Sequence, residues 1–173
     1  MRKIFWLALS LLLILACNGP TKITQKGLAY ARLGDPMPAK GLTELAGLTA
    51  RDTLYNEGGF SWRALILNYG NGEVFIEEDF GQQGLINRIR IETPQLKASK
   101  KRLVGMSWSE LLPMKNNWDA IYLVNYGVWD VVSASQNRIH YLLEEQRDTA
   151  SFDWQGGINS ILTDANVKAI VVM

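Results

Sequence analysis

The chain has 173 residues, of which 47% are hydrophobic and 20% charged, with 18 Lys and Arg against 17 Asp and Glu. This charge balance excludes the basic surface of a nucleic-acid-binding protein and a polybasic membrane patch. One cysteine excludes a disulfide framework within the chain. About 150 residues beyond the N-terminal segment are enough for one domain with a substantial core.

The N-terminus has the layout of a lipoprotein export signal. Arg2 and Lys3 precede thirteen apolar or small residues, 4–16, and Cys17 follows. The run is shorter than the roughly 20 residues of a membrane-spanning helix, and its length is typical of a cleavable signal. Ile14-Leu15-Ala16-Cys17 resembles the lipobox of bacterial lipoproteins, which implies cleavage before Cys17 and lipidation of its thiol. The alternatives are an ordinary signal with an incidental cysteine and an uncleaved anchor.

The expected lipid anchor determines the domain layout and the location. Residues 1–16 are predicted as the signal peptide, 17–25 as the lipidated cysteine and tether, and 26–173 as a single domain. Two or more acyl chains hold a protein stably at a membrane. By resemblance to enterobacterial lipoproteins, Asn18 favours the outer membrane and leaves open which face carries the protein. Cleavage removes two basic residues, so the mature chain carries 16 basic and 17 acidic side chains.

Short strands and few helices are predicted along the domain. Segment 43–48 is predicted as a weak helix broken at Gly47. Strands at 60–69 and 73–77 form a hairpin through Gly70-Asn71-Gly72, because this tripeptide is strong turn chemistry. Ser107 and Glu110 have the spacing of a capping box and predict a helix that ends near Pro113. The remaining predicted strands are 85–93, 120–125, 128–134, 138–144 and 168–173.

Internal similarity suggests two copies of one unit. Three pairs of short segments resemble each other and occur in the same order in both halves of the chain. We therefore predict repeat units at about 28–96 and 98–145, followed by a C-terminal strand at 168–173. The expected fold is α+β, an antiparallel sheet built from two repeated units with a few short helices. The paired segments are 32–37 with 102–107, 64–70 with 120–127, and 87–91 with 137–141.

The glycine-containing segments also carry a family resemblance. Arg-Leu-Gly-Asp-Pro-Met (32–37) and Leu-Val-Gly-Met-Ser-Trp-Ser-Glu-Leu (103–111) are similar to the paired Gly-Met-Ser-x-x-Glu-Leu segments of uncharacterised bacterial lipoproteins. More distantly, the order of strand, glycine turn, helix and antiparallel sheet resembles β-lactamase inhibitory proteins and small outer-membrane assembly lipoproteins. The first copy departs from the pattern at Pro36 and Pro38. The resemblance implies a binding or assembly role and provides no catalytic residue.

The titratable residues do not form a convincing catalytic pattern. His140 is the only histidine and alternates with Ile139 and Tyr141, which predicts a sheet-face histidine paired across strands. A Ser-His-Asp site would need it, but no Gly-x-Ser-x-Gly segment supplies the nucleophile. We therefore predict no catalytic residue, no metal site and no cofactor.

An acidic cluster around residues 73–79 offers a different chemistry. Glu73, Glu77, Glu78 and Asp79 could bind Ca²⁺, or supply paired carboxylates for glycan hydrolysis if one faced Glu144 or Asp153 across a cleft. Against this, the Asp-x-Asp-x-Asp-Gly loop is missing and adjacent strand residues point to opposite faces. The cluster is predicted as a solvated rim.

The tryptophans are the best candidates for recognition, because Trp is favoured at interfaces and its ring also stacks on sugars. Trp62, Trp108 and Trp129 lie in patterned segments and are predicted as core. Trp118 and Trp154 lie in polar surroundings and are predicted either to anchor loops or to contact a partner or glycan.

Together these observations predict a non-enzymatic lipoprotein of the bacterial cell envelope, held in the membrane by its lipid. Its expected partner is an envelope protein, bound through the sheet face or the loops. The alternative is a glycan- or peptidoglycan-binding module that uses Trp118 and Trp154.

Overall fold

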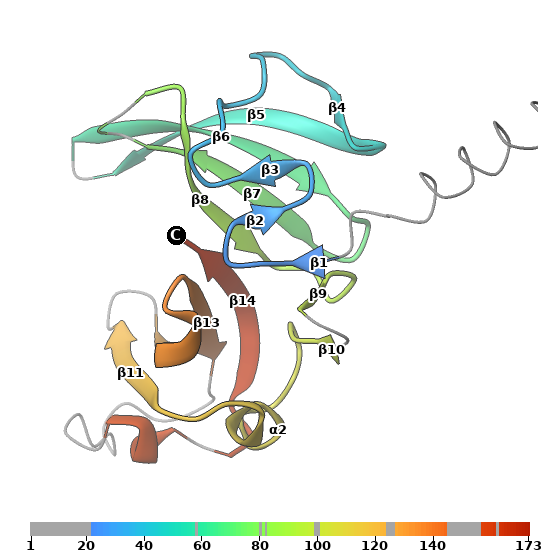
Figure 1. The fold of residues 1–173 in the computed structure, drawn as a ribbon. Helices are drawn as coiled ribbons and strands as arrows, with labels where there is room; N and C mark the ends of the chain where they lie inside the picture. The colour runs from blue at the N-terminus through green and yellow to red at the C-terminus, as the bar shows by residue number, and fades with distance from the viewer. Residues whose placement is uncertain are drawn as a thin grey trace, which may run out of the picture.

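A nine-stranded antiparallel sheet dominates the computed structural model (Figure 1). The structure describes residues 22–57, 59–79, 81, 83–98, 101–123, 127–144, 157–161 and 163–173. The strand order is β11-β12-β13-β14-β8-β7-β6-β5-β4. The strands are β4 (Glu44–Leu45), β5 (Leu48–Glu57), β6 (Phe60–Asn68), β7 (Glu73–Glu78), β8 (Ile86–Ile91), β11 (Trp118–Leu123), β12 (Val128–Ser133), β13 (Ile139–Glu144) and β14 (Asn166–Val172).

The fold is mostly β, so the predicted α+β class is wrong. Within the described residues the regular helix is limited to α2 (Trp108–Leu111), which continues as the 3₁₀ turn η1 (Leu112–Met114), and two further 3₁₀ turns, η3 (Ala134–Gln136) and η5 (Gly157–Ser160). Segment 43–48, predicted as a helix, forms β4, a turn and the start of β5. Ala46 and Gly47 have φ values of 55° and 76°. Two successive left-handed residues reverse the chain and cannot continue a right-handed helix.

Two antiparallel meanders, β5 to β8 and β11 to β14, make up the sheet together with the short strand β4. They join where β14 pairs with β8, with Ile170 opposite Ile91 and Val172 opposite Ile89. The segments that resemble each other in sequence fall on β6 and β11 and on β8 and β13. The duplication itself stays a prediction.

The predicted helix cap is confirmed at α2. The backbone N–H of Ser107 donates to Glu110 Oε2 at 3.1 Å, which closes the capping box. Trp108 and Leu111 are the buried side of this single turn. No helix in the described part of the chain combines the length and the apolar character needed to cross a membrane.

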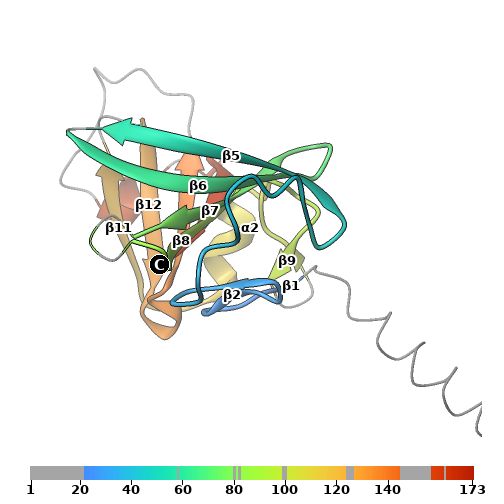
Figure 2. The same ribbon diagram turned by 90° about the horizontal axis from the view of Figure 1, so that it is seen from above.

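The core lies between one face of the large sheet and a layer of short elements. Figure 2 shows α2 grouped with β1 (Lys22–Ile23), β2 (Gly27–Leu28) and β9 (Lys97–Ala98) on one side of the sheet. β3 (Ala31–Arg32) pairs with β2, and β10 (Lys101–Arg102) pairs with β9. The apolar side chains of this core come from alternate strand residues, which point to the same face of the sheet. They include Leu65, Leu67, Val74, Ile76, Ile89, Ile91, Trp129, Val131, Tyr141, Ile170 and Val172.

Candidate functional site

The other face of the sheet contains a hollow of about 500 Å³. The residues that line it come from β5, β6, β7 and β8 and from β12, β13 and β14. Figure 1 shows the sheet as a curved surface, with β5 and β6 at the top and β11 and β13 at the bottom. Both halves of the chain therefore contribute to one surface. Its aromatic and charged lining residues are Tyr55, Trp62, Glu77, Arg88, Arg90, Glu92, Asp130, His140 and Lys168. Apolar lining comes from Val128, Leu142, Ala169, Val171 and Met173.

Strand register places these side chains next to one another. Glu77 lies opposite Arg88 on the neighbouring strand β8. Arg90 lies opposite Val171 of β14, and Val171 in turn lies opposite His140 of β13. Residues that are opposite in register point to the same face of a sheet. Charged positions from β7, β8 and β13 thus meet in one hollow.

Glu77 is the buried anion of this site, with 2% of its surface exposed. Arg88 donates to Glu77 Oε2 from Nε at 2.8 Å and also from Nη2. Arg90 Nε lies 3.7 Å from Glu77 Oε1. A buried carboxylate needs such partners to offset its desolvation. The prediction that Glu77 belongs to a solvated rim is therefore wrong, because cations two strand positions apart enclose it.

Arg90 connects the buried Glu77 to the half-buried Glu92. Its Nη1 lies 3.0 Å from Glu92 Oε1, and its guanidinium carbon lies 4.0 Å from the centre of the Phe75 ring. Its Nε is buried and has no hydrogen-bond partner among the described residues. The aromatic face and the two carboxylates together hold the guanidinium in place.

His140 forms the cross-strand pair that its sequence pattern predicts. Its Nδ1 lies 2.8 Å from Oδ1 and 3.1 Å from Oδ2 of Asp130 on β12. An ionised carboxylate only accepts, so Nδ1 is the donor of this pair. None of the described lining residues is a serine, threonine or cysteine, so this pair has no hydroxyl or thiol nucleophile beside it.

Lys168 marks the outer edge of the hollow. Its Nζ donates to Glu144 Oε1 at 2.8 Å, and both side chains are about half exposed. Among the described residues, no group of three or more His, Cys, Asp or Glu side chains is arranged to bind a metal ion.

Trp118 lies on the core side of the sheet, away from the hollow. Its half-buried ring packs edge-on against Trp108 and Tyr141, with centroid distances of 5.5 and 5.6 Å. Its indole nitrogen donates to the Leu112 carbonyl at 3.0 Å. These contacts match the loop-anchoring alternative for Trp118.

The other predicted site residues are distributed differently. Trp108 and Trp129 are buried, as predicted. Trp62, also predicted as core, is half-buried and lines the hollow beside Tyr55. The predicted strands do not include β5, so sequence reasoning missed Tyr55 as the cross-strand neighbour of Trp62. Cys17, Trp154, Asn18 and Asp153 lie outside the described residues.

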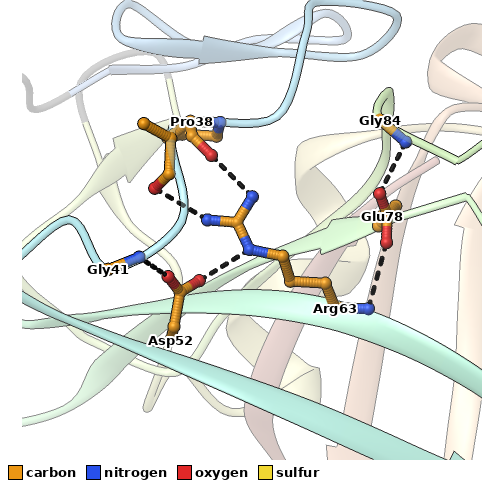
Figure 3. Close-up of polar contacts among 7 residues, drawn as sticks. Pro38, Gly41, Asp52, Arg63, Glu78 and Gly84 are labelled. Carbon is orange, nitrogen blue, oxygen red and sulfur yellow. Dashed lines mark hydrogen bonds and ion pairs between the residues drawn. The ribbon is translucent and has the colours of Figure 1, made fainter.

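A second polar cluster has a structural role (Figure 3). Arg63 on β6 donates from Nε to Asp52 on β5 at 2.7 Å, and from Nη1 and Nη2 to the carbonyls of Pro38 and Ala39 at 2.6 and 2.9 Å. The Gly41 N–H also donates to Asp52. The network fastens the loop before β4 to the sheet and uses the donors of Arg63 within the protein.

The environment of Asp52 changes its acidity. Burial alone would raise the pKa of Asp52, but hydrogen bonds from Arg63 and Gly41, and the nearby charges of Arg63 and Lys40, outweigh burial and lower the pKa below 3.8. The aspartate is therefore held ionised by the cluster that it stabilises.

Comparison with known proteins shows a distant similarity of fold. No protein-family model matches the chain, and no curated protein matches it. The chain is similar to the crystal structure of the uncharacterised protein YfeY from Escherichia coli, with a TM-score of 0.66 and 15% identity over 88% of this chain and 99% of YfeY. At this identity the similarity concerns the fold alone.

Proposed function

We propose that this chain is a lipid-anchored binding protein of the bacterial cell envelope, without catalytic activity, whose ligand occupies the hollow on the charged face of the sheet. The lipobox-like Ile14-Leu15-Ala16-Cys17 supports the anchor, and Asn18 supports the outer membrane. The ligand that the sequence predicts is an envelope protein, with a glycan as the alternative.

The hollow itself carries the proposal. Binding sites are concave, with apolar walls and a few well-placed polar groups, and occupy about 300–1,000 Å³. This hollow, at about 500 Å³, has an aromatic pair on β5 and β6 and ion-paired side chains on β7, β8, β12 and β13. Strands from both meanders hold its walls, so the site is formed by the fold before a ligand arrives.

The polar groups of the hollow favour binding over catalysis. Glu77 is held by Arg88, and Asp130 is held by His140. A general acid or base must exchange protons with a substrate, whereas these groups are engaged with each other across the strands. The described lining also offers no serine, threonine or cysteine for covalent catalysis.

Site-specific photo-crosslinking in living cells tests the proposal. A photoreactive phenylalanine derivative replaces Tyr55 in the full-length lipoprotein, and the control replaces the exposed Leu112 on the core side of the sheet. We expect an adduct with an envelope component from position 55 and none of the same identity from position 112. Identical adducts from both positions, or none from position 55, would refute a ligand in the hollow.

An envelope protein bound at the sheet edges is the second candidate. Leu54 on β5 and Ile121 on the edge strand β11 are 62% and 64% exposed. Exposed apolar side chains at or beside the edge of a sheet favour contact with another protein. Crosslinks from position 54 but not from position 55 would support this candidate over the hollow.

A further inference from the structure

The geometry points to a neutral polyhydroxylated ligand, a glycan segment of one or two sugar rings, as the occupant of the hollow. This inference rests on the proposed binding function and names the ligand class for the same site. The glycan site proposed here does not use Trp118 or Trp154. Trp118 lies on the core side of the sheet, and Trp154 lies outside the described residues.

An aromatic pair provides an apolar platform at one wall of the hollow. Tyr55 and Trp62 lie opposite each other in register, with ring centroids 5.7 Å apart and planes inclined by 31°. The ring faces of Tyr and Trp are large and apolar. A sugar ring has a face of C–H groups and an equator of hydroxyls, so it can pack on such a platform and still reach polar groups.

The charges of the hollow cancel. Arg88, Arg90 and Lys168 supply three cations, and three carboxylates, those of Glu77, Glu92 and Asp130, line the same surface. A phosphate or an acidic peptide would approach carboxylates as closely as cations, so this surface gives an anion little net attraction. An apolar ligand would cover charged groups without bonding to them, which costs free energy. Charge complementarity therefore favours an uncharged polar ligand.

Donors and acceptors remain beside one another after the internal ion pairs form. Arg88 uses Nε and Nη2 on Glu77, and a guanidinium has five N–H donors, so donors remain at Nη1. Glu92 is bound to Arg90 through Oε1, and a carboxylate has about four lone-pair positions. His140 adds its second ring nitrogen, Nε2, which can take part in a further hydrogen bond.

A hydroxyl group both donates and accepts, so neighbouring hydroxyls can bridge these groups. A sugar matches this mixed array of donors and acceptors. A ligand that has only acceptors would use the cations of the hollow and leave its carboxylates without a partner. The platform and the mixed array occur on the same surface, which is the combination that a carbohydrate requires.

Glycan binding by the full-length lipoprotein in micelles of a detergent without a sugar headgroup tests this inference. A glycan array of neutral and acidic bacterial oligosaccharides is probed first, and the strongest neutral oligosaccharide is then titrated by calorimetry, with inorganic phosphate as the charged comparison. We expect neutral glycans to bind and phosphate not to compete. Binding of acidic glycans or phosphate alone, or of no glycan, overturns the inference.

Variants of the platform locate the binding in the hollow. We expect Trp62→Ala to raise the Kd at least tenfold, equivalent to about 1.4 kcal/mol, and Trp62→Phe to lose less affinity because an aromatic face remains. Leu54→Ala is the matched control, because this exposed neighbour of Tyr55 points to the opposite face and should leave the Kd unchanged. Unchanged affinity in a folded Trp62→Ala variant, verified by its thermal melting curve, would also overturn the inference.

The two experiments separate the two proposals. If position 55 crosslinks to a protein and no neutral glycan binds, the ligand class is wrong and the binding function stands. If position 55 captures no envelope component, the hollow is not the binding site and the proposed function fails together with the ligand class.

Discussion

Replacing Arg63 with alanine should lower the free energy of unfolding by about 3 kcal/mol, since loss of one partner from a buried ion pair costs about 3–5 kcal/mol. The Arg63 residue is 8% exposed, and its guanidinium bonds Asp52 and the carbonyls of Pro38 and Ala39. The lower end of the range applies for two reasons. The Asp52 side chain is 24% exposed, so water can solvate it, and without Arg63 it still accepts the hydrogen bond from the Gly41 N–H.

Thermal and chemical unfolding measure this loss. For a domain of this size, 3 kcal/mol corresponds to a decrease in melting temperature of about 6–12 °C. Arg51→Ala is the matched control, since Arg51 and Glu73 form a long 3.7 Å pair with side chains 64% and 39% exposed. Exposed pairs contribute about 0.2–1 kcal/mol. If Arg63→Ala costs no more than Arg51→Ala, the reasoning about the cluster is refuted.

The same cluster predicts a dependence on pH. The folded state lowers the pKa of Asp52 below 3.8, so its contribution to stability is present above pH 3.8 and is lost as the pH falls through the folded value. The difference in unfolding free energy between the wild type and Arg63→Ala should therefore shrink in acid. A difference that stays constant from neutral pH into strong acid would show that the ionised carboxylate is not what Arg63 stabilises.

Three further predictions concern other parts of the chain. Gly72→Ala should destabilise by about 2–3 kcal/mol, because at a φ of 151° an added Cβ meets the backbone of Glu92, whereas Gly70→Ala in open space should cost less in urea unfolding. Burial raises the pKa of Tyr141 to about 12 and its hydroxyl has no partner among the described residues, so its contribution to stability is lost as pH rises through that value. Tyr141→Phe should remove this alkaline loss and should not lower stability at neutral pH, and equal alkaline profiles in melting experiments would contradict the assignment. Metabolic labelling with radioactive palmitate should mark the wild type in the outer-membrane fraction and not Cys17→Ala; equal labelling would exclude the lipobox interpretation.

Local patterns determined the elements whose signals lie within a few residues. Ser107 and Glu110 predict the start of α2, and the glycines around Asn71 predict the turn between β6 and β7, since capping and turn geometry depend on neighbouring residues alone. The alternation around His140 likewise predicts its place on a strand, and Asp130 is the cross-strand partner. Local sequence was misleading at 43–48, where the left-handed turn at Ala46 and Gly47 replaced a helix.

Tertiary structure decided which residues share a surface. Glu77 belongs to an acidic run whose composition is typical of an exposed segment. Only the pairing of β7 with β8 brings Arg88 beside it, and this ion pair offsets the cost of burying the carboxylate. Trp62 is predicted as core, but in the structure it lines the hollow, where Tyr55 of β5 is its cross-strand neighbour. Trp118 instead packs on the core side of the sheet. By itself, then, the sequence determined most strands of the large sheet and the helix cap, and it predicts a lipid anchor. The hollow depends on strand pairing between distant segments and on the curvature of the sheet, and neither is encoded in any local run of residues.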